Sequence, residues 1–437
     1  MKKNLLYWII LTLVISFGRL NAQKNTTFST IEIDRLTYAQ YLKADWKNLI
    51  KTGNEAIKQH INFYYLKIRL GIAYFNLKSY RKAITYLYDA YRVDPENTFV
   101  ASYLYKAYLL GGRPFDAYRL AKTFPNSLRK KMLSSQDHFI NEAGISFKVD
   151  FLPDYTADTK ADLIDQYVIK KNVYYGFDLL NYYKGGNLFY LNSGIIDAKV
   201  NHYYIDNNEQ QVSQMFITQY EIYLANYSQI TNGLNWALAF NNLVSTTTNK
   251  FFQSINFRQS RAITNTTVSF DFVGFTGVRK DINNFRVGIT STLGNINTNW
   301  QLMPAFELVY YPFGNANLYL YTSSAYKMEA TNKEVLTDLI IKSGLGLRLG
   351  PFFVETNYTE GNMYHYIEND ALIVHNDDEK MSQRYELSFV AYLLKRKLKL
   401  YLKGQQYTKT NFFWRNTQQE QLKYNNKTII TGILWKI

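Results

Sequence analysis

The chain has 437 residues, enough for two or three domains, and a formal net charge of +15. It contains no cysteine, which excludes a disulfide framework, thiol catalysis and cysteine-bound zinc. Aromatic residues make up 17% of the chain and 39 residues are Tyr. Such a Tyr content is typical of aromatic belts at membrane interfaces, where a ring has one dry end and one wet end.

The first residues predict an export signal. The basic segment MKKN precedes the apolar segment LLYWIILTLVISFG, and the small residue Ala22 comes just before Gln23. This order is the secretory pattern, and the apolar segment is too short for an ordinary membrane-spanning helix. We therefore predict a signal peptide at 1–22. Leu20 departs from the preference for a small residue three positions before the cut, and an uncleaved anchor helix is the alternative.

Residues 35–135 have a helical pattern. One segment carries residues at the characteristic positions of a tetratricopeptide repeat: Leu70, Gly71, Tyr74, Ala83, Leu87, Ala90 and Pro95. Small Gly71 and Ala83 would let two antiparallel helices approach closely, and Pro95 would end the second helix. A looser copy follows, in which Tyr105 replaces the expected small residue. We predict a helical domain at 23–140 with two to three such repeats; a generic array of helical hairpins is the alternative.

Repeats of this kind form a concave surface that binds other proteins. Tyr and Arg are favoured anchors at protein interfaces. The side chains that we predict to form the interaction surface for a periplasmic protein partner are Tyr103, Tyr105, Arg113 and Arg119. The alternative is that such side chains only pack against the rim of the domain that follows.

After about residue 143 the helical pattern gives way to alternation, broken by Asn, Gly and Asp turns. In IIKSGLGLRLG, Leu345 and Leu347 share one face, whereas Lys342 and Arg348 share the other. Many such segments have 10 to 15 residues, with charges on the polar face. Strands that are apolar outside and polar inside are typical of transmembrane barrels, whereas a secreted sandwich would bury a purely apolar face.

We therefore predict an α+β multi-domain chain, with the helical repeats followed by an antiparallel transmembrane β-barrel at 141–437. About 14 strands are expected, and 12 to 16 are possible, since bacterial barrels use even numbers. The residues predicted to face the lumen are Lys342, Arg348, Glu355, Lys399 and Lys403. The residues predicted to face lipid include Leu345, Leu347, Leu400 and Leu402.

The final segment, KTIITGILWKI, is predicted to be the closing strand, with Ile429, Ile433, Trp435 and Ile437 on its lipid face. Tight turns are expected at LKRK, RLGP and PFGN, and longer connections at 411–422, 359–382 and 329–335. Bacterial barrels have short periplasmic turns and longer external loops. The tight turns, the C-terminus and the helical repeats are therefore expected in the periplasm.

The export signal, the repeat at 64–97 and the barrel ending in ITGILWKI together resemble Bacteroidetes-type outer-membrane proteins related to the YaiO family. This resemblance implies an outer-membrane location and the fold described above, and it does not imply a particular activity. A more distant likeness is to exopolysaccharide export porins, which join a tetratricopeptide scaffold to a barrel but have much longer arrays.

The strongest candidate for chemistry is MYHYIENDALIVHNDDE, which contains His365, Glu368, Asp370 and His375. Histidine and carboxylates in a loop could bind a divalent cation. Their spacing matches no metal motif, however, and we expect a small external hairpin with a solvated acidic end. The glycine spacing of GLGLRLG fits no nucleotide-binding loop. We predict no catalytic residue, no cofactor, no metal and no nucleic-acid partner.

The leading functional hypothesis is a non-enzymatic one. The barrel would act as a channel or export component for an anionic or saccharide-like molecule, and the repeats would recruit a periplasmic protein. One alternative is an assembly scaffold with a plugged barrel. The other is a lipid-modifying enzyme at the barrel rim. The width of the pore distinguishes the channel from the plugged scaffold, and this width depends on strand tilt, shear and inward loops.

Overall fold

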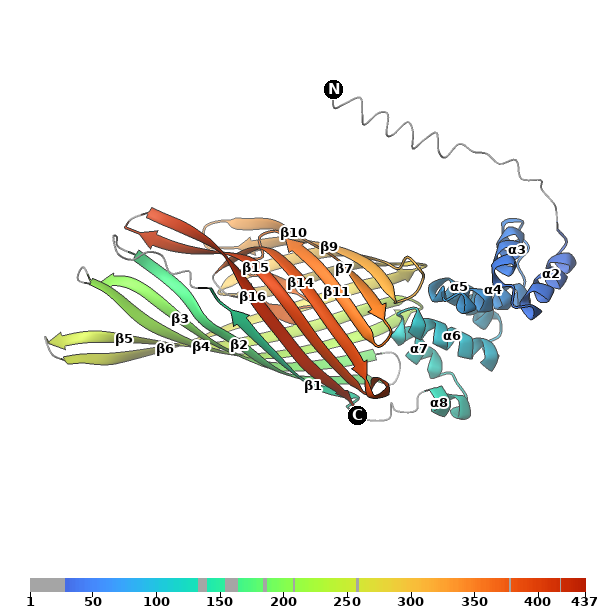
Figure 1. Ribbon diagram of the computed structural model, residues 1–437, viewed down its shortest axis with the longest axis horizontal. Coiled ribbons are helices and arrows are strands. Elements are labelled where there is room, and N and C mark those ends of the chain that lie inside the picture. The colour runs from blue at the N-terminus through green and yellow to red at the C-terminus, as the bar shows by residue number, and fades with distance from the viewer. Residues whose placement is uncertain are drawn as a thin grey trace, which may run out of the picture.

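The protein consists of a helical domain and a closed β-barrel, which lie end to end (Figure 1). The computed structural model describes residues 28–132, 140–153, 164–183, 187–206, 209–256, 259–376, 379–416 and 418–437. The predicted signal peptide at 1–22 lies outside these residues. Among the helices that the structure describes, none combines the length and the apolar character needed to cross a membrane.

The helical domain is built from hairpins that recur along the chain. Its helices are α2 (Thr30–Leu42), α3 (Trp46–Lys58), α4 (Tyr64–Asn76), α5 (Tyr80–Val93), α6 (Thr98–Leu110), α7 (Pro114–Ala121) and α8 (Asn126–Met132). The first residues of α2, α4 and α6 are spaced 34 positions apart along the chain. The first residues of α3, α5 and α7 have the same spacing. The helices therefore form three hairpins of one repeating unit, which agrees with the upper number predicted from the sequence.

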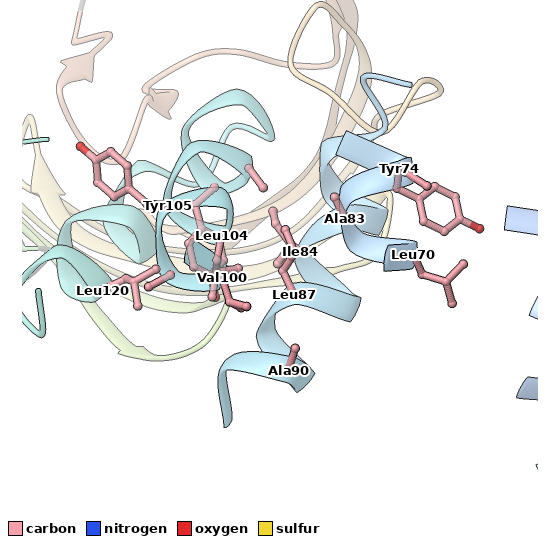
Figure 2. Close-up of a cluster of buried hydrophobic side chains, with 14 of the residues drawn as sticks. Leu70, Tyr74, Ala83, Ile84, Leu87, Ala90, Val100, Leu104, Tyr105 and Leu120 are labelled. Atoms are coloured by element: carbon pink, nitrogen blue, oxygen red, sulfur yellow. The ribbon is translucent and has the colours of Figure 1, made fainter. Parts of the chain in front are cut away.

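The core of the helical domain is apolar and depends on small residues at the helix contacts. Leu70, Leu87 and Leu104 are completely buried between successive helices (Figure 2). A Cβ atom at Gly71 would lie 2.6 Å from Cγ of Leu87, so only glycine allows α4 and α5 to pack this closely. Ser29 begins α2 with a capping box, because its hydroxyl accepts the backbone N–H of Glu32.

Fourteen strands close the barrel. They are β1 (Glu142–Phe151), β2 (Ile164–Tyr183), β3 (Asn187–Asp206), β4 (Glu209–Thr231), β5 (Leu234–Asn256), β6 (Gln259–Ile282), β7 (Phe285–Ile296), β8 (Asn299–Tyr310), β9 (Leu318–Ala330), β10 (Val335–Leu349), β11 (Phe352–Glu360), β14 (Lys380–Leu393), β15 (Leu398–Arg415) and β16 (Gln418–Lys436). All their pairings are antiparallel, and β1 closes the barrel on β16 from Glu142↔Lys436 to Phe151↔Lys427. The predicted fold class and strand number are confirmed.

The two faces of the barrel wall differ in polarity. Large apolar side chains point outward and are exposed, among them Ile145, Phe270 and Ile289. On the inner face polar side chains are buried, including Asn241 and Thr428. Alternation with a period of two produces both faces from the same strands. An apolar outside around a polar inside is the pattern of a barrel surrounded by lipid.

The connections of the barrel differ in part from the prediction. Tight turns do follow β8, β10 and β14, at 311–317, 350–351 and 394–397. The long loop predicted at 411–422 is wrong, because β15 and β16 remain paired from Asn411↔Leu422 to Arg415↔Gln418. Its polar residues indicated a loop, but backbone pairing continues in these long strands whatever the side-chain polarity. The longer connection predicted at 329–335 is wrong as well, because β9 and β10 are joined by a short turn at 331–334. The connection between β11 and β14 is long, as predicted.

Candidate functional site

The connection between β11 and β14, residues 361–379, is called the inward loop below, and its described part at 361–376 folds into the barrel. It contains a two-stranded hairpin, β12 (Ile367–Glu368) paired with β13 (Ile373–Val374). Met363 and Ala371 are completely buried. The sequence predicted a hairpin here, but its placement outside the barrel with a solvated acidic end is wrong. The acidic residues lie inside because the barrel wall supplies cations to pair with them.

The first anchor of the inward loop is Glu368. Both of its oxygens accept hydrogen bonds from Arg384 on β14, with Nη2 2.6 Å from Oε2, and both side chains are buried. Lys342 Nζ lies 3.5 Å from the same carboxylate, and His375 Nε2 lies 3.1 Å from it. Burial alone would raise the pKa of the Glu368 carboxyl, but Arg384 and Lys342 outweigh burial and hold that pKa well below its usual range.

The second anchor is Asp370, which forms a bidentate pair with Arg279 on β6 at 2.7 and 3.0 Å. Arg279 also forms a bidentate pair with Glu307 on β8, at 2.7 and 2.9 Å. One guanidinium therefore holds two carboxylates, one from the wall and one from the loop. Next to it, Asn241 Nδ2 donates to the backbone oxygen of Ala371 at 2.9 Å, which fixes the loop backbone as well.

The third anchor is His365, whose Nδ1 lies 2.7 Å from the carboxylate of Glu329 on β9. Both side chains are almost completely buried. Lys327 lies 3.5 Å from Glu329 and donates to the backbone oxygen of Tyr364, so a wall cation also holds the loop. Within the described residues, no three His, Asp or Glu side chains are arranged to hold a metal ion. The titratable groups of the loop serve as anchors to the wall.

Two cavities flank the inward loop. The large chamber has a volume of about 730 Å³ and is lined on one side by Glu368, Asn369 and Leu372 of the loop. The small chamber has a volume of about 240 Å³ and is lined by the same three loop residues from the other side. The inward loop therefore forms a partition between two spaces in the lumen.

The helical domain is fixed to the barrel end that carries the tight turns. Arg81 on α5 pairs with Asp281 at the end of β6, with both side chains buried, and its guanidinium lies 3.8 Å from the ring centre of Tyr311. Asp116 on α7 accepts the backbone N–H of Gly233 at 2.9 Å. Backbone bonds join the parts as well, since the N–H of Arg81 donates to the oxygen of Gly314 at 2.8 Å.

The four residues predicted to form an interaction surface differ in their contacts. Tyr105 is buried in the helical core, where burial raises the pKa of its hydroxyl to about 12. Tyr103 packs edge-on against Phe75. Arg113 contacts the barrel through Asn232, and Arg119 Nη1 donates to the backbone oxygen of Ile230 at 2.6 Å. Burial alone would lower the pKa of Arg113, but Asp116 outweighs it and raises that pKa.

The five residues predicted to face the lumen occur on β10, β11 and β15. Lys342 contacts the inward loop, because its Nζ lies 3.5 Å from the Glu368 carboxylate. Glu355 accepts hydrogen bonds from the hydroxyls of Tyr319 and Tyr321, and Lys403 Nζ lies 3.0 Å from Glu386. Lys399 is half-buried, and Arg348 Nε donates to the backbone oxygen of Gly350 at the tight turn.

Sequence reasoning missed the side chains that organise the lumen. Arg279, Glu307 and Arg384 are the main examples, because they hold the inward loop. Each sits at an inward position of an alternating strand, which is a signal that alternation alone could have provided. Their pairing could not be found in this way, because Arg279 and Asp370 are 91 positions apart.

The comparisons with known proteins add few details. No protein-family model and no curated protein match the chain. Among solved structures, the toluene transporter TodX of P. putida is similar with 6% identity and a TM-score of 0.42, over 68% of this chain and 90% of that chain. A FadL homologue of Pseudomonas aeruginosa is similar with 7% identity and a TM-score of 0.44, over 72% and 95% of the two chains. At such scores, the assignment of a closed barrel depends on the strand pairing itself.

Proposed function

We propose that this protein is a bacterial outer-membrane channel that passes an anionic or saccharide-like molecule, with its helical domain in the periplasm. The exposed apolar face of the barrel supports the membrane location. Its strands have 9 to 24 residues, and about 9 to 11 suffice to cross a bilayer. In this location, side chains such as those of Leu345 and Leu347 contact outer-membrane lipid.

The turns and termini support the orientation. The tight turns at 311–317, 350–351 and 394–397 share one end of the barrel with the C-terminus and the helical domain (Figure 1). The opposite end also has short turns, at 297–298 and 331–334, but the inward loop starts there and is the longest connection between described neighbouring barrel strands. Bacterial barrels carry their short turns on the periplasmic side. The inward loop would then start from the cell surface.

The observation that carries the proposal is the inward loop with a chamber on each side. A passage needs space in the lumen and an element that restricts it, and both occur here. The plugged scaffold remains the second candidate, because the loop is held by buried ion pairs at Glu368 and Asp370. No arrangement among the described residues favours the third hypothesis, an enzyme at the rim.

The experiment that tests this proposal is liposome swelling with the purified full chain. In one variant, residues 364–376 are replaced by a short Gly-Ser linker, which is sterically possible because Glu360 and Gln383 are paired across the strands. We expect the wild type to admit small solutes slowly and this variant to admit them several-fold faster. The control carries the same linker in the turn at 331–334. Impermeability of both wild type and loop variant would support the plugged scaffold instead.

We also propose that the helical domain binds a periplasmic protein. Between residues 28 and 132 the chain has 18 Lys and Arg against 8 Asp and Glu, so most of the net charge lies in this domain. Ile31, Tyr65 and Phe99 occupy the second position of α2, α4 and α6, and all three are exposed. An exposed apolar row on a basic domain suits a partner with apolar and acidic side chains.

A photo-crosslinking amino acid at Tyr65 of the full chain tests this second proposal. We expect a discrete crosslinked species in cells, weakened by Ile31→Ser together with Phe99→Ser. The matched control places the same crosslinker at exposed Lys58, at the end of α3. A crosslinking pattern that is the same at Tyr65 and at Lys58 would contradict a specific partner on this row.

A further inference from the structure

The cations on the wall of the large chamber are already paired with carboxylates. Arg279 pairs with Glu307 and Asp370, and Arg286 Nε lies 3.1 Å from Asp281. Lys342 lies 3.5 Å from Glu368. An anion that took one of these cations would leave a carboxylate without its partner in a buried site, which is costly. The charge pattern therefore disfavours an anionic ligand in this chamber.

Tyrosine is the most frequent large side chain on the same wall. The tyrosines that line the large chamber are Tyr227, Tyr311, Tyr319, Tyr321 and Tyr366. A tyrosine ring offers an apolar face for packing and a hydroxyl for hydrogen bonds. The small chamber repeats this composition with Tyr174, Tyr190, Tyr401 and Tyr407. Rings of this kind match a ligand that has both apolar faces and many hydroxyl groups.

One polar atom on the wall has no partner. Thr292 on β7 lines the large chamber and is 5% exposed as a residue, and its buried hydroxyl forms no hydrogen bond with any described residue. Buried polar groups are normally hydrogen-bonded, so this hydroxyl suits a ligand that supplies the missing partner. A pure hydrocarbon could not supply it.

We propose that the large chamber is a binding site for a neutral saccharide of a few rings. The proposal rests on the channel function proposed above and names its substrate class. The volume of about 730 Å³ lies within the usual range of small-molecule sites, roughly 300 to 1,000 Å³. Sugar rings pack against the tyrosine faces, their hydroxyls bond to Thr292 and the tyrosine hydroxyls, and the paired charges stay paired.

The test is equilibrium binding to the detergent-solubilised full chain, measured by calorimetry. The probes are neutral trisaccharides of glucose, of galactose and of mannose, trigalacturonate as an anionic analogue, and toluene as a hydrocarbon. We expect saturable binding of at least one neutral trisaccharide and weaker binding of trigalacturonate and toluene. Binding does not require passage, so a failure here with normal liposome swelling would refute the substrate class and leave the channel intact.

Thr292→Val makes the test specific to this chamber. The change removes a hydroxyl that has no partner in the protein, so folding should be unaffected, whereas trisaccharide binding should weaken about 3- to 10-fold, the value of one hydrogen bond. The control is Ser291→Ala, on the opposite face of the same strand. The proposal is overturned if no neutral trisaccharide binds, if trigalacturonate or toluene binds more tightly, or if Thr292→Val binds as tightly as the wild type.

Discussion

The helical domain and the barrel of this protein bury opposite kinds of side chain. The helical domain encloses Leu70, Leu87 and Leu104, whereas the barrel encloses Lys327 and Arg384, all with at most 1% exposure. The hydrophobic effect operates on both regions, but their surroundings differ. Water surrounds the helices, so apolar groups turn inward. In the proposed bilayer, lipid surrounds the barrel wall, so apolar groups turn outward and polar groups line the lumen.

This difference has a consequence for stability. The helical core tolerates little change in side-chain volume, because contacts such as that of Gly71 with Leu87 are already close. The barrel interior tolerates changes of volume better, but it depends on charges that stay paired. The four predictions below test this comparison, starting with the largest expected effect.

The largest effect is expected in the barrel interior, from Glu368→Ala. The change leaves the buried Arg384 without its bidentate partner, which typically costs about 3–5 kcal/mol. Because the lost pair joins the inward loop to the wall, the loop should leave the lumen before the barrel unfolds. Protease added to intact cells should then cleave within 361–379. The control, Glu360→Ala at the exposed end of β11, should leave the loop resistant.

In the helical domain, Leu87→Ala should remove about 3 kcal/mol from the free energy of unfolding, the usual cost of a cavity at a fully buried leucine. Circular dichroism should show the helical signal melting at lower temperature. The heat-resistant band of the barrel in detergent gels should not change, because no barrel strand depends on Leu87. Simultaneous loss of both signals would mean that the two regions do not fold independently.

On the barrel wall, Leu347→Arg and Arg348→Leu are neighbouring changes on opposite faces. An Arg at a lipid-facing site costs about 2–4 kcal/mol at mid-membrane and less near the interface, so Leu347→Arg should impair assembly measurably. Within the described residues, the Arg348 side chain donates a hydrogen bond only to the backbone oxygen of Gly350, so its loss should have little effect. The yield of folded barrel in outer-membrane fractions measures both. Equal yields would contradict the assigned faces.

The smallest effect concerns pH. The pKa of Glu368 is lowered in the folded protein, so its ionised form stabilises the inward loop at pH values above the unfolded pKa of about 4.5. This contribution is lost only as the pH falls through the lower folded value. The protease resistance of the inward loop should therefore stay constant from about pH 5 to about pH 8. A loss of resistance between pH 7 and 5 would indicate that another group controls the loop.

Much of this architecture could be predicted from the sequence, because it depends on local periodicity. Alternation around Lys342 and Leu345 indicates a strand with two different faces, and the spacing of Gly71 and Ala83 indicates a close helical hairpin. The inward loop could not be placed in this way. Whether Glu368 and Asp370 are solvated or buried depends on Arg384 and Arg279 from other strands, and only the closed barrel brings these cations to the loop.

The surroundings of the residues in the predicted interaction surface also depend on contacts that a local sequence pattern does not contain. The prediction for Tyr105 and Arg113 depends on residue type, which indicates a propensity for interfaces but does not identify a particular interface. In the folded protein Tyr105 belongs to the helical core and Arg113 to the contact with the barrel. The exposed row of Ile31, Tyr65 and Phe99 was visible in the sequence only through the 34-residue period of the helices.

The central claim is that residues 361–376 lie inside the barrel, and thiol labelling tests it most directly. Because the chain has no cysteine, a single Ala371→Cys can be compared with Lys333→Cys, which lies in an exposed turn at the same end of the barrel. Intact cells would be treated with a bulky, membrane-impermeant maleimide. An inward loop predicts rapid labelling at position 333 and almost none at position 371. Equally rapid labelling at both positions would contradict the account.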